Sequence, residues 1–277
     1  MQHRTFLEYR RYRYLKIALL LVIASIVAYS IHSSPVGRYG GSPVGYVLGS
    51  IAAALIVALM WLGVQKRRYR ANVGGLRGWV SAHVYLGTSL IVIATLHAGF
   101  QIGWNVHTLA YALMIMVIVS GFFGVYAYLR FPSLMTENMG EDTRDGLILK
   151  IADLDRELRR VALSLPDEFV KIVEASVRDT RIGGSVLTQL SRRPANCPTQ
   201  RAVAFINAAG KTLKGEAQQQ NHALYALMLR KQKLVKRARD DVRFKALLDL
   251  WLYAHVPLSF ALLGALLAHI VAVFFYW

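Results

Sequence analysis

The stretch HVYLGTSLIVIATLH, from His83 to His97, places a histidine at each end of thirteen residues that carry no charge. The stretch HVPLSFALLGALLAH, from His255 to His269, repeats the same spacing in a distant part of the chain. Fourteen helical residues rise about 21 Å and turn about 40° short of four full turns. Each stretch, as a helix, therefore carries its two imidazoles near one face and at two depths.

The composition indicates a polytopic membrane protein. Of the 277 residues, 55% are hydrophobic, yet the formal net charge is +17, so the basic residues must lie outside the apolar runs. Crossing a hydrocarbon core of about 30 Å takes about 20 apolar helical residues. Five runs are long enough, and we expect an all-α membrane helix bundle whose spans lie near 15–31, 44–64, 79–100, 107–129 and 250–277.

The basic residues predict how the spans are oriented. Five Lys and Arg precede the first span, one follows it, five lie between the second and third spans, none between the third and fourth, and 22 between 130 and 245. Since basic loops stay on the cytoplasmic side, we expect a cytoplasmic N-terminus and an outer C-terminus in a bacterial-type inner membrane. The first run resembles a signal peptide, but IHSSP offers no small-x-small cleavage site, so we expect a retained span.

The positive charge and the single cysteine limit the classes of partner and cofactor. Lys and Arg beside membrane spans are expected from insertion and from attraction to anionic lipid, so we expect membrane lipid and no nucleic acid as a partner. Cys197 is the only cysteine, which excludes an internal disulfide, a Cys-rich iron–sulfur or zinc site and covalently attached haem. Any cofactor must be held by histidine or by packing.

Three segments are expected: membrane spans in 1–129, a cytoplasmic helical insert in 130–245, and the fifth span in 246–277. In the insert, apolar residues recur at steps of three and four, which predicts a helix seam: Leu147, Ile151, Leu154, Leu158 and Val161. After Gly215 no glycine or proline interrupts the sequence until the last span, so one long helix is expected to feed into it. The insert has no GxGxxG or GxxxxGK[ST] motif and is interpreted as a scaffold or docking surface, with Lys231, Lys233 and Lys236 as docking cations.

The four histidines of the two stretches are predicted metal ligands. A polar ring in lipid is costly and usually faces the interior of a bundle. Parallel helices place His83 opposite His255 and His97 opposite His269, giving two layers of two imidazoles. Zinc usually takes four protein ligands, or three with water, whereas haem asks the protein only for axial ligands. Two histidines per layer therefore favour non-covalent b-type haem.

Other residues are secondary candidates for cofactor binding. Gly87 and Gly264 lie between the ligands on their helices, and Gly121 and Gly124 interrupt the fourth span. Absent side chains let a flat macrocycle approach, although small residues in membrane helices also serve helix packing. At the cytoplasmic edge, Arg77 can meet haem propionates or act as a positive-inside anchor, as can two further arginines, Arg68 and Arg70.

Histidines fourteen residues apart on two helices resemble the ligands of the di-haem membrane cytochromes b. The resemblance is strongest to the transmembrane module of ferric reductases and NADPH oxidases, and in ligand arrangement it extends to the cytochrome b of quinol-oxidising complexes. It rests on the stretches 83–97 and 255–269 and covers the transmembrane part of the chain. It implies two b haems stacked across the membrane, with the four histidines as axial ligands.

Three functions remain open from the sequence. Two histidines per iron leave no open position for a substrate, which favours an electron-transfer subunit. Such a subunit relays electrons between quinone and partners such as a multihaem cytochrome c, an iron–sulfur protein or a flavin protein. The alternatives are a terminal ferric-reductase-like oxidoreductase at the outer face, and a non-redox transporter or scaffold with structural histidines. His107, at the outer start of the fourth span, is expected to face water or to hydrogen-bond a propionate or quinone.

Overall fold

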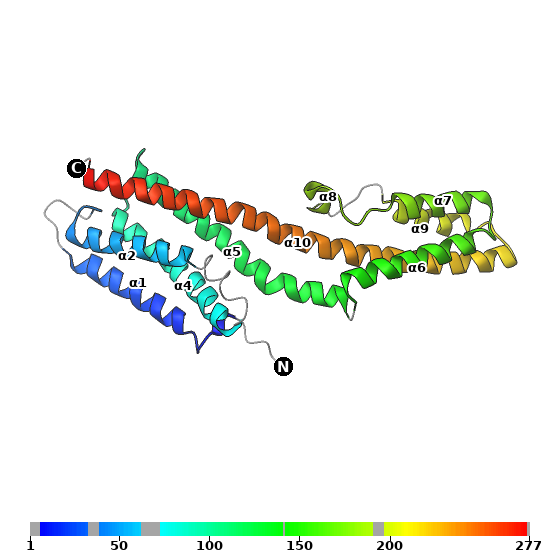
Figure 1. Cartoon of the computed structure of the whole chain (residues 1–277), viewed down its shortest axis with the longest axis horizontal. Helices are drawn as coiled ribbons and strands as arrows, with labels where there is room; N and C mark the ends of the chain where they lie inside the picture. The colour runs from blue at the N-terminus through cyan, green and yellow to red at the C-terminus, as the bar shows by residue number, and fades with distance from the viewer. Residues whose placement is uncertain (1–5, 33–38, 62–72, 141, 191–196, 276–277) are drawn as a thin grey trace. The chain divides into compact units, whose positions relative to one another are not determined.

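The protein is helical throughout the part of the chain that the structure describes. The computed structural model describes residues 6–32, 39–61, 73–140, 142–190 and 197–275, and no strand occurs among them (Figure 1). Internal contacts divide the chain into two units: Met1–Leu129 with Trp251–Trp277, and Arg130–Leu250. The all-α class predicted from the sequence is confirmed.

Five helices of the described residues are long and apolar enough to cross a membrane. They are α1 (Arg13–Ile31), α2 (Pro43–Met60), α4 (Val73–Ala98), α5 (Val106–Met139) and α10 (Glu216–Phe275). Their number is the one predicted, and the protein is a multi-pass membrane protein. The fourth helix does not end at 129 as expected but continues to Met139 with Pro132 inside it, and residues 62–64 of the expected second span lie outside the described residues.

Helix ends in the membrane unit are set by local chemistry. Ser42 begins α2, because its Oγ accepts a hydrogen bond from the Gly45 amide at 3.1 Å and Pro43 occupies the first turn. Helix α4 ends at Ala98, where Gly99 and Phe100 adopt φ values of 59° and 63°, a left-handed turn that closes a helix.

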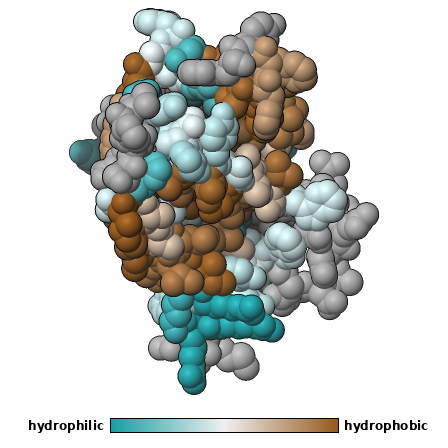
Figure 2. Space-filling model, turned by 90° about the vertical axis from the view of Figure 1, so that its left-hand side faces the viewer, coloured by the Kyte–Doolittle hydropathy of each residue, from teal (hydrophilic) through white to brown (hydrophobic). Residues whose placement is uncertain are grey.

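The core of the membrane unit lies between α2, α4, α5 and α10. Its buried members are all apolar: Leu48, Ala52, Ile56, Leu90, Ile93, Met114, Leu262 and Leu266. Many large apolar side chains of the membrane helices are instead exposed, for example Leu20 on α1 and Phe274 on α10. Figure 2 shows such brown, apolar side chains gathered over much of one face of the molecule. An apolar surface of this kind is suited to lipid contact.

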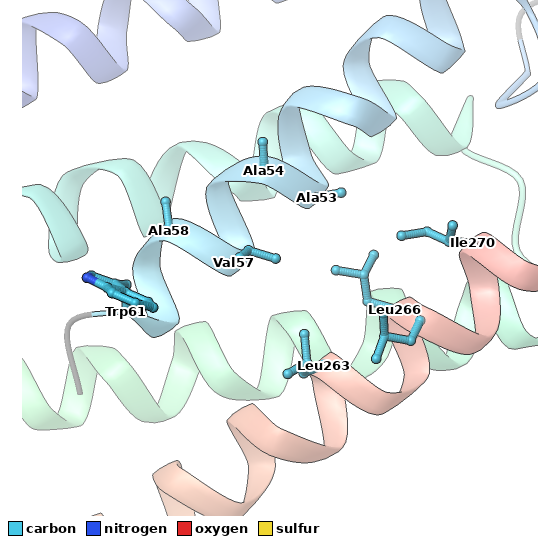
Figure 3. Close-up of a pocket in the computed structure, with 9 residues that line it drawn as sticks. Ala53, Ala54, Val57, Ala58, Trp61, Leu263, Leu266 and Ile270 are labelled. Carbon is cyan, nitrogen blue, oxygen red and sulfur yellow. The ribbon is translucent and has the colours of Figure 1, made fainter. Parts of the chain in front are cut away.

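An apolar groove of about 560 Å³ separates α2 from α10 within the membrane unit (Figure 3). Val57 from α2 and Leu266 from α10 point into it, and the exposed indole of Trp61 lies at one end. The remaining lining residues are also apolar: Ala53, Ala54, Ala58, Leu263, Leu267 and Ile270. The small side chains of α2 leave this space open.

The second unit contains α6 (Arg144–Ala162), α7 (Asp167–Asp179), α8 (Val186–Leu190), α9 (Pro198–Ala209) and the first part of α10. The predicted seam of α6 is confirmed: all but one of its residues are buried, and the last, Val161, is partly buried against the core. The predicted long helix is also confirmed, because α10 is one helix of 60 residues. The segment before α9 has only the short α8 among its described residues, as its glycine and proline breaks suggest.

Lys231 is buried in the second unit and is not a docking cation. Its side chain is 1% exposed, and its Nζ lies 2.6 Å from an Asp155 carboxylate oxygen and 3.0 Å from the Ser176 carbonyl oxygen. The other two lysines of the expected docking set, Lys233 and Lys236, are exposed. Lys231 therefore joins α10 to α6 and α7 from inside the core.

Replacing Lys231 should destabilise the second unit. Lys231→Met keeps an unbranched side chain but leaves the Asp155 carboxylate without its partner, which costs about 3–5 kcal/mol for a buried pair. Proteolysis of the purified full chain at increasing urea concentration measures the effect, and Lys236→Met on the exposed face of the same helix is the control. Equal protease resistance of the two variants would show that the pair does not stabilise the unit.

Candidate functional site

The four predicted histidines form two layers within the membrane unit. His83 of α4 faces His255 of α10 with ring centroids 6.5 Å apart and an angle of 64° between the ring planes. His97 and His269 form the second layer, with centroids 6.0 Å apart and an angle of 81°. This is the pairing expected from the equal spacing along parallel helices. All four rings are partly buried.

The two histidines of α4 are held by backbone carbonyls of α2. Nδ1 of His83 lies 3.2 Å from the Leu59 carbonyl oxygen, and Nδ1 of His97 lies 2.8 Å from the Gly45 carbonyl oxygen. A carbonyl oxygen only accepts, so Nδ1 of each ring carries the proton and donates it. Each neutral ring therefore keeps its lone pair on Nε2.

His255 is held in the same tautomer by a hydroxyl group. Its Nδ1 lies 2.6 Å from Oγ of Ser120 on α5, and that hydroxyl donates its one proton to the Val117 carbonyl oxygen at 2.8 Å. Ser120 Oγ must then accept from Nδ1 of His255. The indole of Trp251 covers the His255 ring at a centroid distance of 5.3 Å.

His269 has a different kind of partner, the imidazole of His107. The two Nδ1 atoms are in hydrogen-bond contact, and the ring centroids are 4.3 Å apart. His107 stands in the first turn of α5, just after the turn that ends α4. The sequence analysis gave it no part in the ligand layers, although a fifth histidine at the outer depth of His97 and His269 was a usable signal.

The four Nε2 atoms are available for a ligand. None of them has a hydrogen-bond partner among the described residues, whereas each Nδ1 has one. Histidines that bind metals almost always use their second nitrogen in this way, because the bond fixes the tautomer and the orientation of the ring. The four rings thus share the arrangement typical of metal ligands.

The two rings of each pair are close but not in direct contact through hydrogen bonds. Their centroids lie 6.5 Å apart for His83 and His255 and 6.0 Å apart for His97 and His269. The two histidines of each pair could therefore both contact one small group held between them. Among the described residues, no three His, Cys, Asp or Glu side chains come together to hold a bare ion. Two ligands per layer match a metal that brings its equatorial ligands with it.

The two predicted cofactor-binding glycines differ in their surroundings. At Gly87 an added Cβ would meet only Leu59 Cδ1, at 3.7 Å, so the position is open beside the histidine face of α4. Gly264 is exposed, has nothing within 4 Å, and follows His255 by nine residues, which places it about half a turn away from that ring. The structure therefore does not bring Gly264 to the histidines.

The two glycines of α5 serve different contacts. Gly121 lies against the ligand layer, with His255 Cε1 at 3.7 Å from its ideal Cβ position. At Gly124 the same position is filled by the Trp251 indole, within 2.1 Å, and this indole donates a hydrogen bond to the Ser120 carbonyl oxygen at 2.8 Å. Trp251 is thus a packing residue beside the site.

Gly49 of α2 is a site residue that the sequence analysis missed. A Cβ at this position would lie 2.6 Å from Cε1 and 3.1 Å from Nε2 of His97. Only glycine therefore lets the His97 ring lie against α2 and reach the Gly45 carbonyl. A lone glycine in an apolar span gives no sequence signal for such a contact, because small residues are common in membrane helices.

The predicted propionate ligands are less well placed by the structure. Arg77 is exposed on α4, six residues before His83, and makes a contact of its own. Arg68 and Arg70 lie outside the described residues. A role for Arg77 as a positive-inside anchor or as a propionate ligand remains a prediction.

An apolar cluster lies between the two layers. Leu90 lies halfway between His83 and His97 in the sequence, and Leu262 lies halfway between His255 and His269. These leucines pack with Ile93, Met114 and the buried face of α2. The candidate site is therefore two pairs of histidines with apolar packing between them.

None of the protein-family models matches this chain, and no curated protein or solved structure is significantly similar to it. The fold and the site define a multi-pass α-helical membrane protein with two pairs of facing histidines.

Adding one methyl group at Gly49 should disturb the His97–His269 layer. Gly49→Ala forces the His97 ring to move and breaks its bond to Gly45, and overpacking of this kind costs about 1–3 kcal/mol. Gly264→Ala adds the same methyl group where the structure has open space. Thermal unfolding of the purified protein in detergent should show a lower Tm for Gly49→Ala and no decrease for Gly264→Ala, and the reverse order would contradict the described contact.

Proposed function

We propose that this protein is a membrane b-type cytochrome subunit. It relays electrons across the membrane through two bis-histidine haems, to or from partner redox proteins or quinone. The observation that carries the proposal is the state of the four imidazoles. Every Nδ1 has a hydrogen-bond partner, no Nε2 has one among the described residues, and the centroids of the two paired rings lie 6.5 Å and 6.0 Å apart.

The chain's own residues hold and orient the haem ligands. His83 with His255, and His97 with His269, would each hold one haem through Nε2. Acceptors on α2 and α5 keep His83, His97 and His255 in the Nδ1–H tautomer, and His269 would take the same tautomer by donating to His107. Bound haem supplies one-electron redox chemistry at its iron. Because both axial positions belong to the protein, the layers favour electron transfer over binding of a substrate to the metal.

The residues between the layers are mostly apolar. Leu90, Ile93, Met114 and Leu262 form a buried cluster between the two histidine pairs. Gly87 and Gly121 leave room beside His83 and His255. We assign these two glycines to the surroundings of the macrocycle and leave Gly264 out.

The sidedness and the partners form part of the proposal. The loop charges support a cytoplasmic N-terminus and an outer C-terminus in a bacterial-type inner membrane, with His83 and His255 nearer the cytoplasm. The partners are electron-transfer proteins such as a multihaem cytochrome c, an iron–sulfur protein or a flavin protein. Quinone is included because the groove between α2 and α10 has an apolar lining suited to an isoprenoid tail.

Removing single ligands should divide the four histidines into two pairs. His83→Leu and His255→Leu each remove an axial ligand from one layer, and His97→Leu and His269→Leu each remove one from the other. In a redox titration monitored by the visible spectrum, the parent protein should show two haem components with separate midpoint potentials. Within each pair, both variants should lose the same haem component or convert it to high spin. His222→Leu, in the second unit, is the control and should keep both.

Two outcomes would contradict the proposal. One is a colourless parent protein that stays colourless after haem supplementation during expression, which would leave the four histidines with a structural role. The other is a different grouping, such as His83→Leu matching His269→Leu, which would be incompatible with the layers described above.

The proposed sidedness predicts the activity of topology reporters. A reporter fused after Trp277 should be active outside the cytoplasm, and one inserted in the turn 210–215 before α10 should be active in the cytoplasm. Alkaline phosphatase and a fluorescent protein that folds only in the cytoplasm measure the two sides independently. Opposite activities of both reporters would reverse the assignment of the layers to the two faces.

A further inference from the structure

His107 differs from the other three partners of the ligand histidines. His83 and His97 donate to backbone carbonyls, and His255 donates to a serine hydroxyl. His269 alone is paired with another imidazole, that of His107. The two layers are therefore alike in ligands and unlike in the groups that support the ligands.

His107 is not placed to hold a metal together with His269. Its ring centroid lies 4.3 Å from that of His269, and the two Nδ1 atoms are in direct hydrogen-bond contact, which leaves no space for an atom between them. The His97 and His269 centroids are farther apart, at 6.0 Å. In addition, His107 contacts Nδ1 of His269, which leaves Nε2 of His269 for the metal.

The position of His107 is fixed by the start of α5. Asn105 caps this helix, because its Oδ1 accepts from the Thr108 amide at 2.9 Å, and Thr108 Oγ1 accepts from the Gly103 amide at 3.0 Å. One turn further along, the Tyr111 hydroxyl lies 2.8 Å from Thr95 Oγ1 on α4. These bonds hold the first turn of α5 beside the end of α4, and His107 with it.

We propose that His107 is a positioning residue that sets the redox potential of the His97–His269 layer. Its Nδ1 accepts a hydrogen bond from the protonated Nδ1 of His269, which fixes the orientation of that ring and increases the electron density that the ring would give to a metal. The inference rests on the proposed function, since it concerns haem held by His97 and His269. With His107 as acceptor, the haem of this layer has a lower midpoint potential than it would have if an oxygen atom accepted the hydrogen bond from His269.

The direction of the effect follows from basicity. An imidazole nitrogen is a stronger base than an amide carbonyl or a hydroxyl oxygen, so it draws the Nδ1–H proton of His269 further from its ring. A ligand with more negative charge stabilises oxidised iron more than reduced iron. Loss of the acceptor should therefore make the midpoint potential of that layer more positive.

The test uses the full chain with its haem, purified in detergent, and three variants. His107→Phe keeps a ring but removes the acceptor, and His107→Gln replaces it by a neutral amide that can still accept. Ser120→Ala makes the corresponding change at the His83–His255 layer. Potentiometric titration followed by visible and electron paramagnetic resonance spectra reports the midpoint potential and the spin state of each haem. The haem component that is missing from His269→Leu is the one that belongs to the His97–His269 layer.

We expect His107→Phe to move only the His97–His269 component to a more positive potential while its spectrum stays low-spin. His107→Gln should shift the potential of this component by a smaller amount. Ser120→Ala should shift only the potential of the His83–His255 component. If His107→Phe loses this haem while His107→Gln keeps it with a positive shift, the proposal also stands.

Several results would overturn the inference. Unchanged potentials in His107→Phe, or equal shifts of both components, would leave His107 a structural residue while the two-haem proposal stands. Loss of the same haem from both His107 variants would make His107 a ligand. A parent protein without haem would overturn both this inference and the proposed function.

Discussion

A ring nitrogen inside a membrane must find a hydrogen-bond partner or a metal, and the arrangement of the membrane unit depends on how the four histidines meet that requirement. An unsatisfied buried polar group costs roughly 1–3 kcal/mol, and lipid offers no water to relieve it. Each Nδ1 is satisfied by another helix, which ties α4 to α2 and α10 to α5. The four Nε2 atoms have no such partner among the described residues, and a ligand held between the rings would supply one.

Much of this organisation could be predicted from the sequence, because it follows from periodicity and spacing. Apolar runs predict the helices, and the repeated interval of fourteen residues predicts which histidines face each other. The supporting groups were harder to predict. The Leu59 and Gly45 carbonyls belong to the backbone, whose acceptors are the same at every position, and the close approach at Gly49 depends on how two helices pack.

The second unit shows both the strength and the limit of reasoning from charge. The heptad-like spacing on α6 marked its buried seam, yet the basic segment of α10 suggested that all its lysines face outward. Lys231 follows Met228 by three residues and precedes Val235 by four, so it falls on the buried stripe of its helix. The stripe was therefore visible in the sequence, but the acidic partner was not, because Asp155 lies on another helix.

The position of α10 at the end of the chain has a consequence for biogenesis. Helices α1, α2 and α4 pack closely with one another and precede α10 by more than a hundred residues in synthesis. His83 and His97 can thus reach their carbonyl partners on α2 while the ribosome is still translating the second unit. Neither histidine layer exists until residues 255 and 269 have entered the membrane, so both sites are completed only when α10 is inserted, and a chain truncated before α10 has half of each.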